Sequence, residues 1–142
     1  MTITPEMVAY LRTMVKGHHV ENDRVEERLD ANDWNDFPRF LAALFFLAVD
    51  RRFGEDASRA DVIQFVAEMR AELGHDAPNI DADQAETLIM STIDPTVGYD
   101  IDPQMIGRIQ AATVHKVLGE DSFTDQGLDA ILAEAVELAE RP

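Results

Sequence analysis

Two adjacent histidines and a run of carboxylates stand together in the stretch GHHVENDRVEERLDANDWND, residues 17–36. His18 and His19, with Glu21 and Asp23 close behind, offer nitrogen and oxygen atoms of the kind that hold a catalytic metal through three protein ligands. Neighbouring residues of a helix point about 100° apart, because one turn holds 3.6 residues. The two histidines can therefore face one ion only from a loop after Gly17. The alternative is a pair of surface histidines at a helix junction.

A further histidine precedes an aspartate at His75-Asp76. This pair resembles the His-Asp pair of the all-helical metal-dependent phosphohydrolases. The resemblance implies an enzyme whose metal takes additional histidine and aspartate ligands from other parts of the chain. His18 or His19 would stand upstream and His115 downstream, although the residues around each histidine depart from that family's pattern.

The carboxylates of residues 17–36 separate by the side of a helix on which they fall. At 3.6 residues per turn, Val25 and Leu29 lie together on a narrow apolar edge. Four acidic residues lie away from that edge and form what we call the acidic ridge: Asp23, Glu26, Glu27 and Asp30. Such a ridge can dock a basic partner, or it can be the solvated face of an acidic protein. We interpret it as the partner-binding surface.

The charge of the whole chain favours a basic partner over nucleic acid or an anionic membrane. The 142 residues hold 12 Lys and Arg against 28 Asp and Glu, a net charge of −16. Residues 1–71 contribute −4 (9 basic, 13 acidic) and residues 72–142 contribute −12 (3 basic, 15 acidic). Phosphate backbones and anionic lipid surfaces would be repelled by this balance.

The absence of cysteine excludes disulfides, thiolate zinc sites, iron–sulfur clusters and cysteine nucleophiles. The N-terminal residues lack the order of a signal peptide, in which a basic segment precedes an apolar one. The longest apolar run, Phe40 to Val49, is ten residues long and too short to span a bilayer. We expect a soluble, cytoplasmic protein without a cofactor.

Caps and breakers predict helices throughout. Thr4-Pro5 and the Ser58/Asp61 pair are typical of helix starts, and Ile80-Asp81 and Ile101-Asp102 look like two similar starts in which an apolar residue precedes an Asp cap. The predicted helices are Pro5 to Gly17, about 20–31, a helix capped by Asn35 or Asp36 that runs to about Phe53, Ser58 to Gly74, Asp81 to Pro95, Pro103 to about Val117, and a last one from Ser122 or Thr124.

These patterns predict an all-α, single-domain protein over residues 1–142, with a possible subdivision near 74–80. About six or seven helices would form an irregular orthogonal bundle around a buried central helix at about 37–53, which is apolar around most of its circumference. We interpret the chain as a non-enzymatic protein–protein interaction module: an adaptor, an inhibitor or an immunity-type protein.

Two alternatives stay open. One is a metal-dependent hydrolase that uses His18, His19, His75, Asp76 and His115. The other is a structural homo-oligomer, because the sequence does not decide whether large aromatic residues are buried within one chain or between two: Trp34, Phe37 and Phe46.

Overall fold

Most helices begin where the sequence supplies a capping side chain. In the computed structural model, which describes residues 3–54, 56–120 and 124–141, the Ser58 hydroxyl accepts from the Asp61 amide while the Asp61 carboxylate accepts from the Ser58 amide. Asp81 and Thr124 accept from the amides of Gln84 and Gly127 in the same way. Each of these bonds satisfies an amide that has no partner within its helix. Ser122 lies outside the described residues.

The described residues form seven α-helices and one 3₁₀ helix, which confirms the all-α prediction. No strand occurs among them, and the stretch 96–101 is a loop. The elements are α1 Pro5–Lys16, α2 His19–Ala31, α3 Phe37–Phe53, α4 Arg59–Leu73, η1 Gly74–Asn79, α5 Ala82–Ile93, α6 Pro103–Glu120 and α7 Asp125–Glu140.

One local expectation differs from the structure. Asp36 stands at the N-cap position of α3, but its backbone is left-handed (φ 69°) and its side chain makes no capping hydrogen bond. Asp tolerates this conformation better than most residues do. Near 74–80, Gly74 ends α4 with a φ of 57°, and η1 follows directly.

The core lies where α3 packs against α6, α7 and α5, so the predicted central helix is central. Phe40, Leu44 and Ala48 are completely buried at helical spacing, and Ile109 and Val114 of α6 are buried opposite. The burial does not extend around the whole of α3, because Phe46 remains 46% exposed. One face of α3 therefore reaches the surface.

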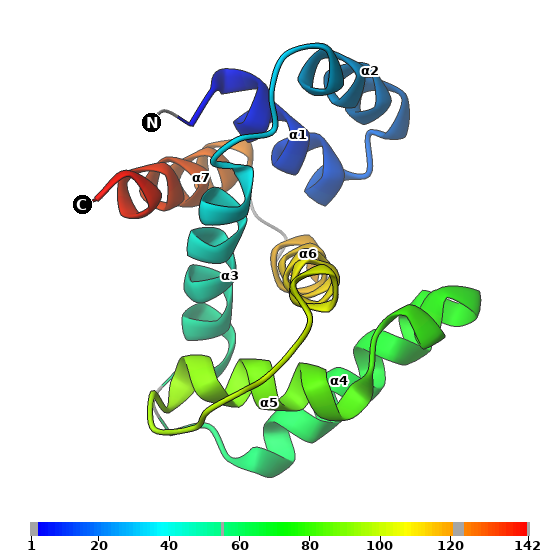
Figure 1. The fold of residues 1–142 in the computed structure, drawn as a ribbon, viewed down its shortest axis with the longest axis vertical. Coiled ribbons are helices and arrows are strands. Elements are labelled where there is room, and N and C mark those ends of the chain that lie inside the picture. Colours follow the sequence, from blue (N-terminus) through cyan, green and yellow to red (C-terminus); the bar gives the residue numbers. More distant parts are fainter. Residues whose placement is uncertain (1–2, 55, 121–123, 142) are drawn as a thin grey trace.

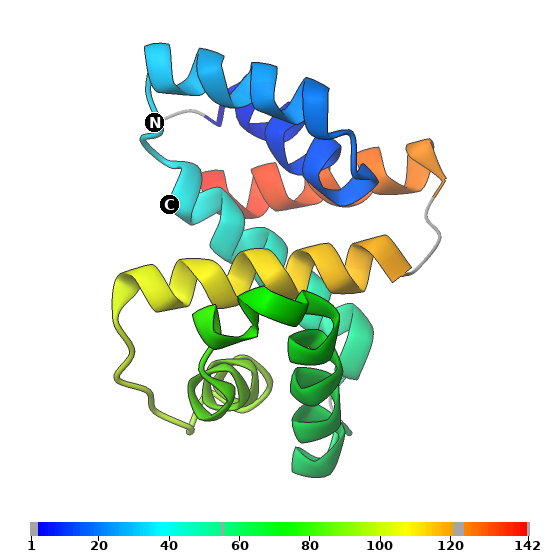
Figure 2. The ribbon, with the colours of Figure 1, turned by 90° about the vertical axis from the view of Figure 1, so that its right-hand side faces the viewer.

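Helix α6 runs through the middle of the molecule and separates two helical groups (Figures 1 and 2). The α1–α2 pair lies on one side, and α4, η1 and α5 lie on the other. Figure 1 looks along α6 while α1 and α3 lie across the view, so these helices cross rather than run side by side. Crossing helices leave spaces at their edges that side chains must fill or line.

Helices α1 and α2 are joined by partly buried hydrogen bonds. The Asn22 amide group of α2 donates to the Tyr10 carbonyl oxygen (2.8 Å) and to the Thr13 hydroxyl (3.0 Å), both on α1. Val25 and Leu29 of α2 are buried, as their spacing predicts. The acidic ridge lies outside this buried edge, on the exposed part of α2.

Within the described parts of the chain, no helix is both long enough and apolar enough to cross a membrane.

Exchanging phenylalanine for alanine at two positions of α3 tests this account of the core. Phe40 is fully buried and Phe46 is 46% exposed. We expect Phe40→Ala to lower the free energy of unfolding by about 3–5 kcal/mol, because it leaves a cavity, and Phe46→Ala to change it by about 0.5 kcal/mol. Urea unfolding measures both. Equal losses at the two positions would contradict the packing described.

Candidate functional site

The acidic ridge is fully presented to solvent. Asp23, Glu26, Glu27 and Asp30 are all exposed on α2. Asp30 is also engaged locally, because its carboxylate accepts a hydrogen bond from the Trp34 indole N–H at 2.7 Å. The ridge therefore ends next to an aromatic side chain, a neighbour that the sequence did not reveal.

The histidines of the metal hypothesis lie on three different elements. His18 and His19 stand where α1 passes into α2, His75 and Asp76 belong to η1, and His115 is on α6. Among the described residues, no group of three His, Asp or Glu side chains could hold a metal ion. The structure thus does not bring three of these five residues together as metal ligands.

Three aromatic rings from α1, α3 and the turn before α3 pack together in what we call the aromatic cluster: Tyr10, Trp34 and Phe37. Their ring centroids lie 5.1–5.6 Å apart, and each pair meets edge to face at 81–89°. All three side chains are half-buried. Edge-to-face pairs add stability beyond the area they bury, so the cluster joins α1 to the segment before α3 and to the start of α3.

The aromatic cluster lies within the electrostatic field of the ridge. Burial raises the pKa of Tyr10 above its ordinary value, and the negative charges of Glu26, Asp30 and Asp23 raise it further. Charges act on a hydroxyl in this way only when they are close to it. The half-buried Tyr10 side chain of α1 therefore lies near three of the four ridge carboxylates.

A large open cavity lies beside the aromatic cluster, between α1, α3 and the first half of α6. Its volume is about 890 Å³, and we call it the apolar cavity. Tyr10 and Met14 line it from α1, and Phe37 and Leu41 line it from α3. The third wall is formed by α6 and includes polar side chains and one cation, Arg108. Its residues are Pro103, Gln104, Ile106, Gly107, Arg108, Gln110 and Ala111. Its volume lies within the range of small-molecule binding pockets.

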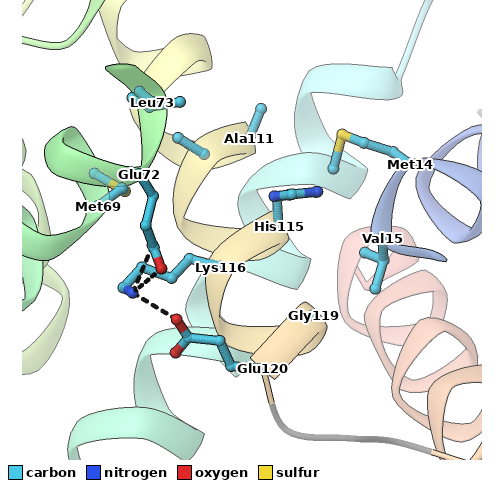
Figure 3. Close-up of a pocket in the computed structure, with 11 residues that line it drawn as sticks. Met14, Val15, Met69, Glu72, Leu73, Ala111, His115, Lys116, Gly119 and Glu120 are labelled. Carbon is cyan, nitrogen blue, oxygen red and sulfur yellow. Dashed lines mark hydrogen bonds and ion pairs between the residues drawn. The ribbon is translucent and has the colours of Figure 1, made fainter. Parts of the chain in front are cut away.

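A second cleft of about 600 Å³ opens on the other side of the crossing between α1 and α6. Met14 and Ala111 line both cavities, so the two adjoin. The second cleft is more polar at one end, where α4 and α6 meet (Figure 3). We call it the polar cleft.

A buried ammonium group dominates the polar cleft. Lys116 is only 6% exposed. Its Nζ contacts Glu72 at 2.8 and 3.0 Å, Glu120 at 2.6 Å and Glu68 at 3.9 Å, and it lies 5.5 Å from the Phe65 ring centroid. These charges form a lysine cluster that joins α4 to α6. Figure 3 shows Glu72 and Glu120 converging on Lys116, while His115 points away from them.

The lysine cluster is held in its ionised form. Burial opposes the charge on Lys116, but hydrogen bonds to Glu120 and Glu72 more than offset this and raise its pKa. The hydrogen bond from Lys116 lowers the pKa of Glu120. A lysine with a raised pKa holds its proton and is a poor nucleophile. The cluster therefore fits a structural role rather than a catalytic one.

Sequence reasoning missed both the aromatic cluster and the lysine cluster. Tyr10 and Trp34 are 24 positions apart and Glu72 and Lys116 are 44 apart, so no local spacing reveals either contact. One signal was available: Lys116 is one of two lysines in the chain and lies four residues before Glu120, a spacing that pairs opposite charges on a helix.

Comparison of the chain with protein-family models, with curated proteins and with solved structures found no match in any of the three.

Acid titration tests the link between Glu120 and Lys116. Because the pKa of Glu120 is lowered in the folded protein, its stabilising effect is present above the unfolded value of about 4.3 and is lost as the pH falls through the folded value. Glu120→Gln should therefore lower the melting temperature at pH 7, and the difference from wild type should shrink below about pH 4. Differential scanning calorimetry measures this.

The matched control is Glu134→Gln, which removes the same charge from an exposed position on α7. We expect it to leave the melting temperature at pH 7 nearly unchanged. A deficit in Glu120→Gln that stays the same from pH 7 to pH 3 would contradict the ion pair.

Proposed function

We propose that this protein works by binding a basic protein partner, as a non-enzymatic adaptor, inhibitor or immunity-type protein. The observation that carries this proposal is the position of the acidic ridge beside the aromatic cluster. Asp30 accepts from Trp34, and the charges of Asp23, Glu26 and Asp30 reach the Tyr10 hydroxyl. Protein interfaces combine apolar aromatic anchors with surrounding charge in this way.

The ridge would act mainly on the rate of encounter. Helix α2, His19–Ala31, carries five carboxylates against two arginines, and the whole chain carries −16. A field of one sign draws an oppositely charged partner toward the surface and orients it, and salt weakens this effect. Exposed ion pairs add little to final affinity, so affinity must come from the apolar surface.

The aromatic cluster supplies the kind of surface that gives affinity. Tyr and Trp combine a large apolar area with a polar tip and few rotatable bonds, which is why they dominate binding energy at protein interfaces. Trp34 and Tyr10 are already held by neighbouring rings, so little side-chain entropy is lost when a partner covers them. In this proposal the protein acts in the cytoplasm, and its lack of cysteine fits a reducing compartment.

Association kinetics test the proposal. The partner is first isolated with the tagged chain from native cells and purified, and its on-rate is then measured by stopped flow at several salt concentrations. We expect the on-rate to fall about tenfold between low and high ionic strength. Glu26→Gln/Glu27→Gln should lower the low-salt on-rate by about threefold or more and flatten its salt dependence.

The control for this prediction is Glu134→Gln/Glu137→Gln, which removes the same charge from exposed positions on α7. It should change the on-rate less than the ridge variant does. An on-rate that does not depend on salt, or equal effects of the two double variants, would refute steering by the ridge.

A further inference from the structure

The apolar cavity is large enough to hold a small molecule, and the proposed function does not use it. Its volume of about 890 Å³ falls within the range of ligand pockets, about 300–1,000 Å³. Most of its lining is apolar, with Leu11 and Met14 on α1, Phe37 and Leu41 on α3, and Ile106 on α6. Such a lining gives affinity by burying the apolar body of a ligand.

The polar side chains of the cavity limit the charge that a ligand can carry. They are Tyr10, Gln104, Arg108 and Gln110. The chain holds 28 Asp and Glu residues, yet none of the described residues that line this cavity carries a carboxylate. The charged group at the cavity is therefore a cation, and it matches a ligand whose polar end is negative.

Arg108 and Gln104 lie together at one edge of the α6 wall. They are four positions apart, so one lies above the other on the surface of the helix. Arg108 is also about 100° around the helix from Gly107, its neighbour in the wall. The guanidinium group and the Gln104 side-chain amide can thus donate hydrogen bonds side by side to one acceptor group.

One hydrogen bond holds the Arg108 side chain in place. Its Nε donates to the Asn79 carbonyl oxygen at 3.0 Å, and Asn79 ends η1, which lies across α6 from the α1–α2 pair (Figures 1 and 2). In the described part of the chain, no carboxylate pairs with Arg108 and its two terminal nitrogens have no acceptor. A guanidinium group held in this way can donate two parallel hydrogen bonds to a carboxylate.

We infer that the apolar cavity binds a small carboxylic acid, with its carboxylate at Arg108 and its apolar body between α1, α3 and α6. The opposite orientation is disfavoured, because Tyr10 on the α1 side lies near the carboxylates of Glu26, Asp30 and Asp23, which repel a negative group. This inference goes beyond the proposed function and needs no protein partner.

Arg108 selects the ligand more than it holds it. The residue is exposed, and exposed ion pairs add little affinity because water screens them. The net charge of −16 also provides no long-range attraction for an anion. Affinity therefore comes mainly from apolar burial, and the cation adds a preference of about threefold or more for an acid over an uncharged analogue.

Octanoate and 1-octanol are suitable probes, because they share one carbon chain and differ in the charge of the head group. Titration of the isotope-labelled full chain, followed by two-dimensional NMR, gives both the affinity and the residues affected. We expect octanoate to shift the amide signals of residues that line the apolar cavity. It should bind about threefold or more tightly than 1-octanol.

Arg108→Gln tests the head-group contact, with Arg70→Gln as its matched control. The Arg70 Nε donates to the Ile80 carbonyl oxygen at 2.9 Å, a bond of the same kind, but Arg70 does not line the apolar cavity. We expect Arg108→Gln to weaken octanoate binding about threefold or more and to leave 1-octanol binding unchanged. Arg70→Gln should change neither affinity by more than about twofold.

Gly107→Leu tests the place of the apolar body. A Cβ atom at Gly107 would meet no other atom within 4 Å, and the residue has no positive φ, so leucine fits the helix and improves its helix propensity. Gly119→Leu is the control, because Gly119 lines the polar cleft and a Cβ atom there has its nearest contact at 3.9 Å. We expect Gly107→Leu to weaken binding of both probes about tenfold or more and Gly119→Leu to weaken neither.

Thermal melting of each variant checks that it is folded. If octanoate does not bind the wild-type chain, or if Gly107→Leu binds both probes like wild type, the cavity is not the site and the inference is wrong. Weaker binding in Gly119→Leu alone would place the ligand in the polar cleft and would also overturn it. Equal loss of octanoate binding in Arg108→Gln and Arg70→Gln would refute the contact between the carboxylate and Arg108.

Discussion

The packing of α3 against α6 is the contact on which the rest of the structure depends. The two helices bury Phe40 and Leu44 on one side and Ile109 and Val114 on the other, and α7 and α5 complete the core around α3. Because α6 uses one face for this packing, its other face is left to α1 and α4, which cover it only in part. The apolar cavity and the polar cleft lie on either side of the place where α1 crosses it. Both are consequences of how helices cross, and the small residues Gly107 and Ala111 keep the α6 wall shallow.

The carboxylates of the polar cleft and those of the acidic ridge differ in what they contact. In the polar cleft, the carboxylates of Glu72 and Glu120 surround a buried lysine, so their charge is used within the fold to hold α4 against α6. On α2, the carboxylates face solvent, and Asp30 is the one that accepts the Trp34 indole N–H. Carboxylates that are already satisfied by a lysine have less to offer a partner than carboxylates hydrated on an open ridge. For this reason the proposed docking surface is the acidic ridge and not the polar cleft.

The sequence predicted the elements well because helix limits are set locally. Thr4, Ser58, Asp81 and Thr124 cap the helices that follow them, and Gly17 and Gly54 end helices with positive φ values. Asp36 shows the limit of this reasoning. It is a favoured residue type at the N-cap position of α3, but its backbone is left-handed and its side chain makes no capping hydrogen bond.

The site was less accessible to sequence reasoning because its parts meet only in three dimensions. The acidic ridge was predicted from the spacing around Val25 and Leu29, and its exposure agrees with that spacing. The aromatic cluster was not predicted, since Tyr10 joins Trp34 and Phe37 only after α1 and α3 have packed. The histidines illustrate the reverse case: residue types suggested a site, but the fold places them on separate elements.

The central claim is the proposal that the acidic ridge and the aromatic cluster form one docking face. Hydrogen–deuterium exchange of the full chain, alone and with its purified partner, tests this most directly because it reports each helix separately. The account predicts slower exchange on binding in α1, α2 and the start of α3, with little change in α4, α5 and α7. Protection confined to α4, α5 or α7 would contradict it.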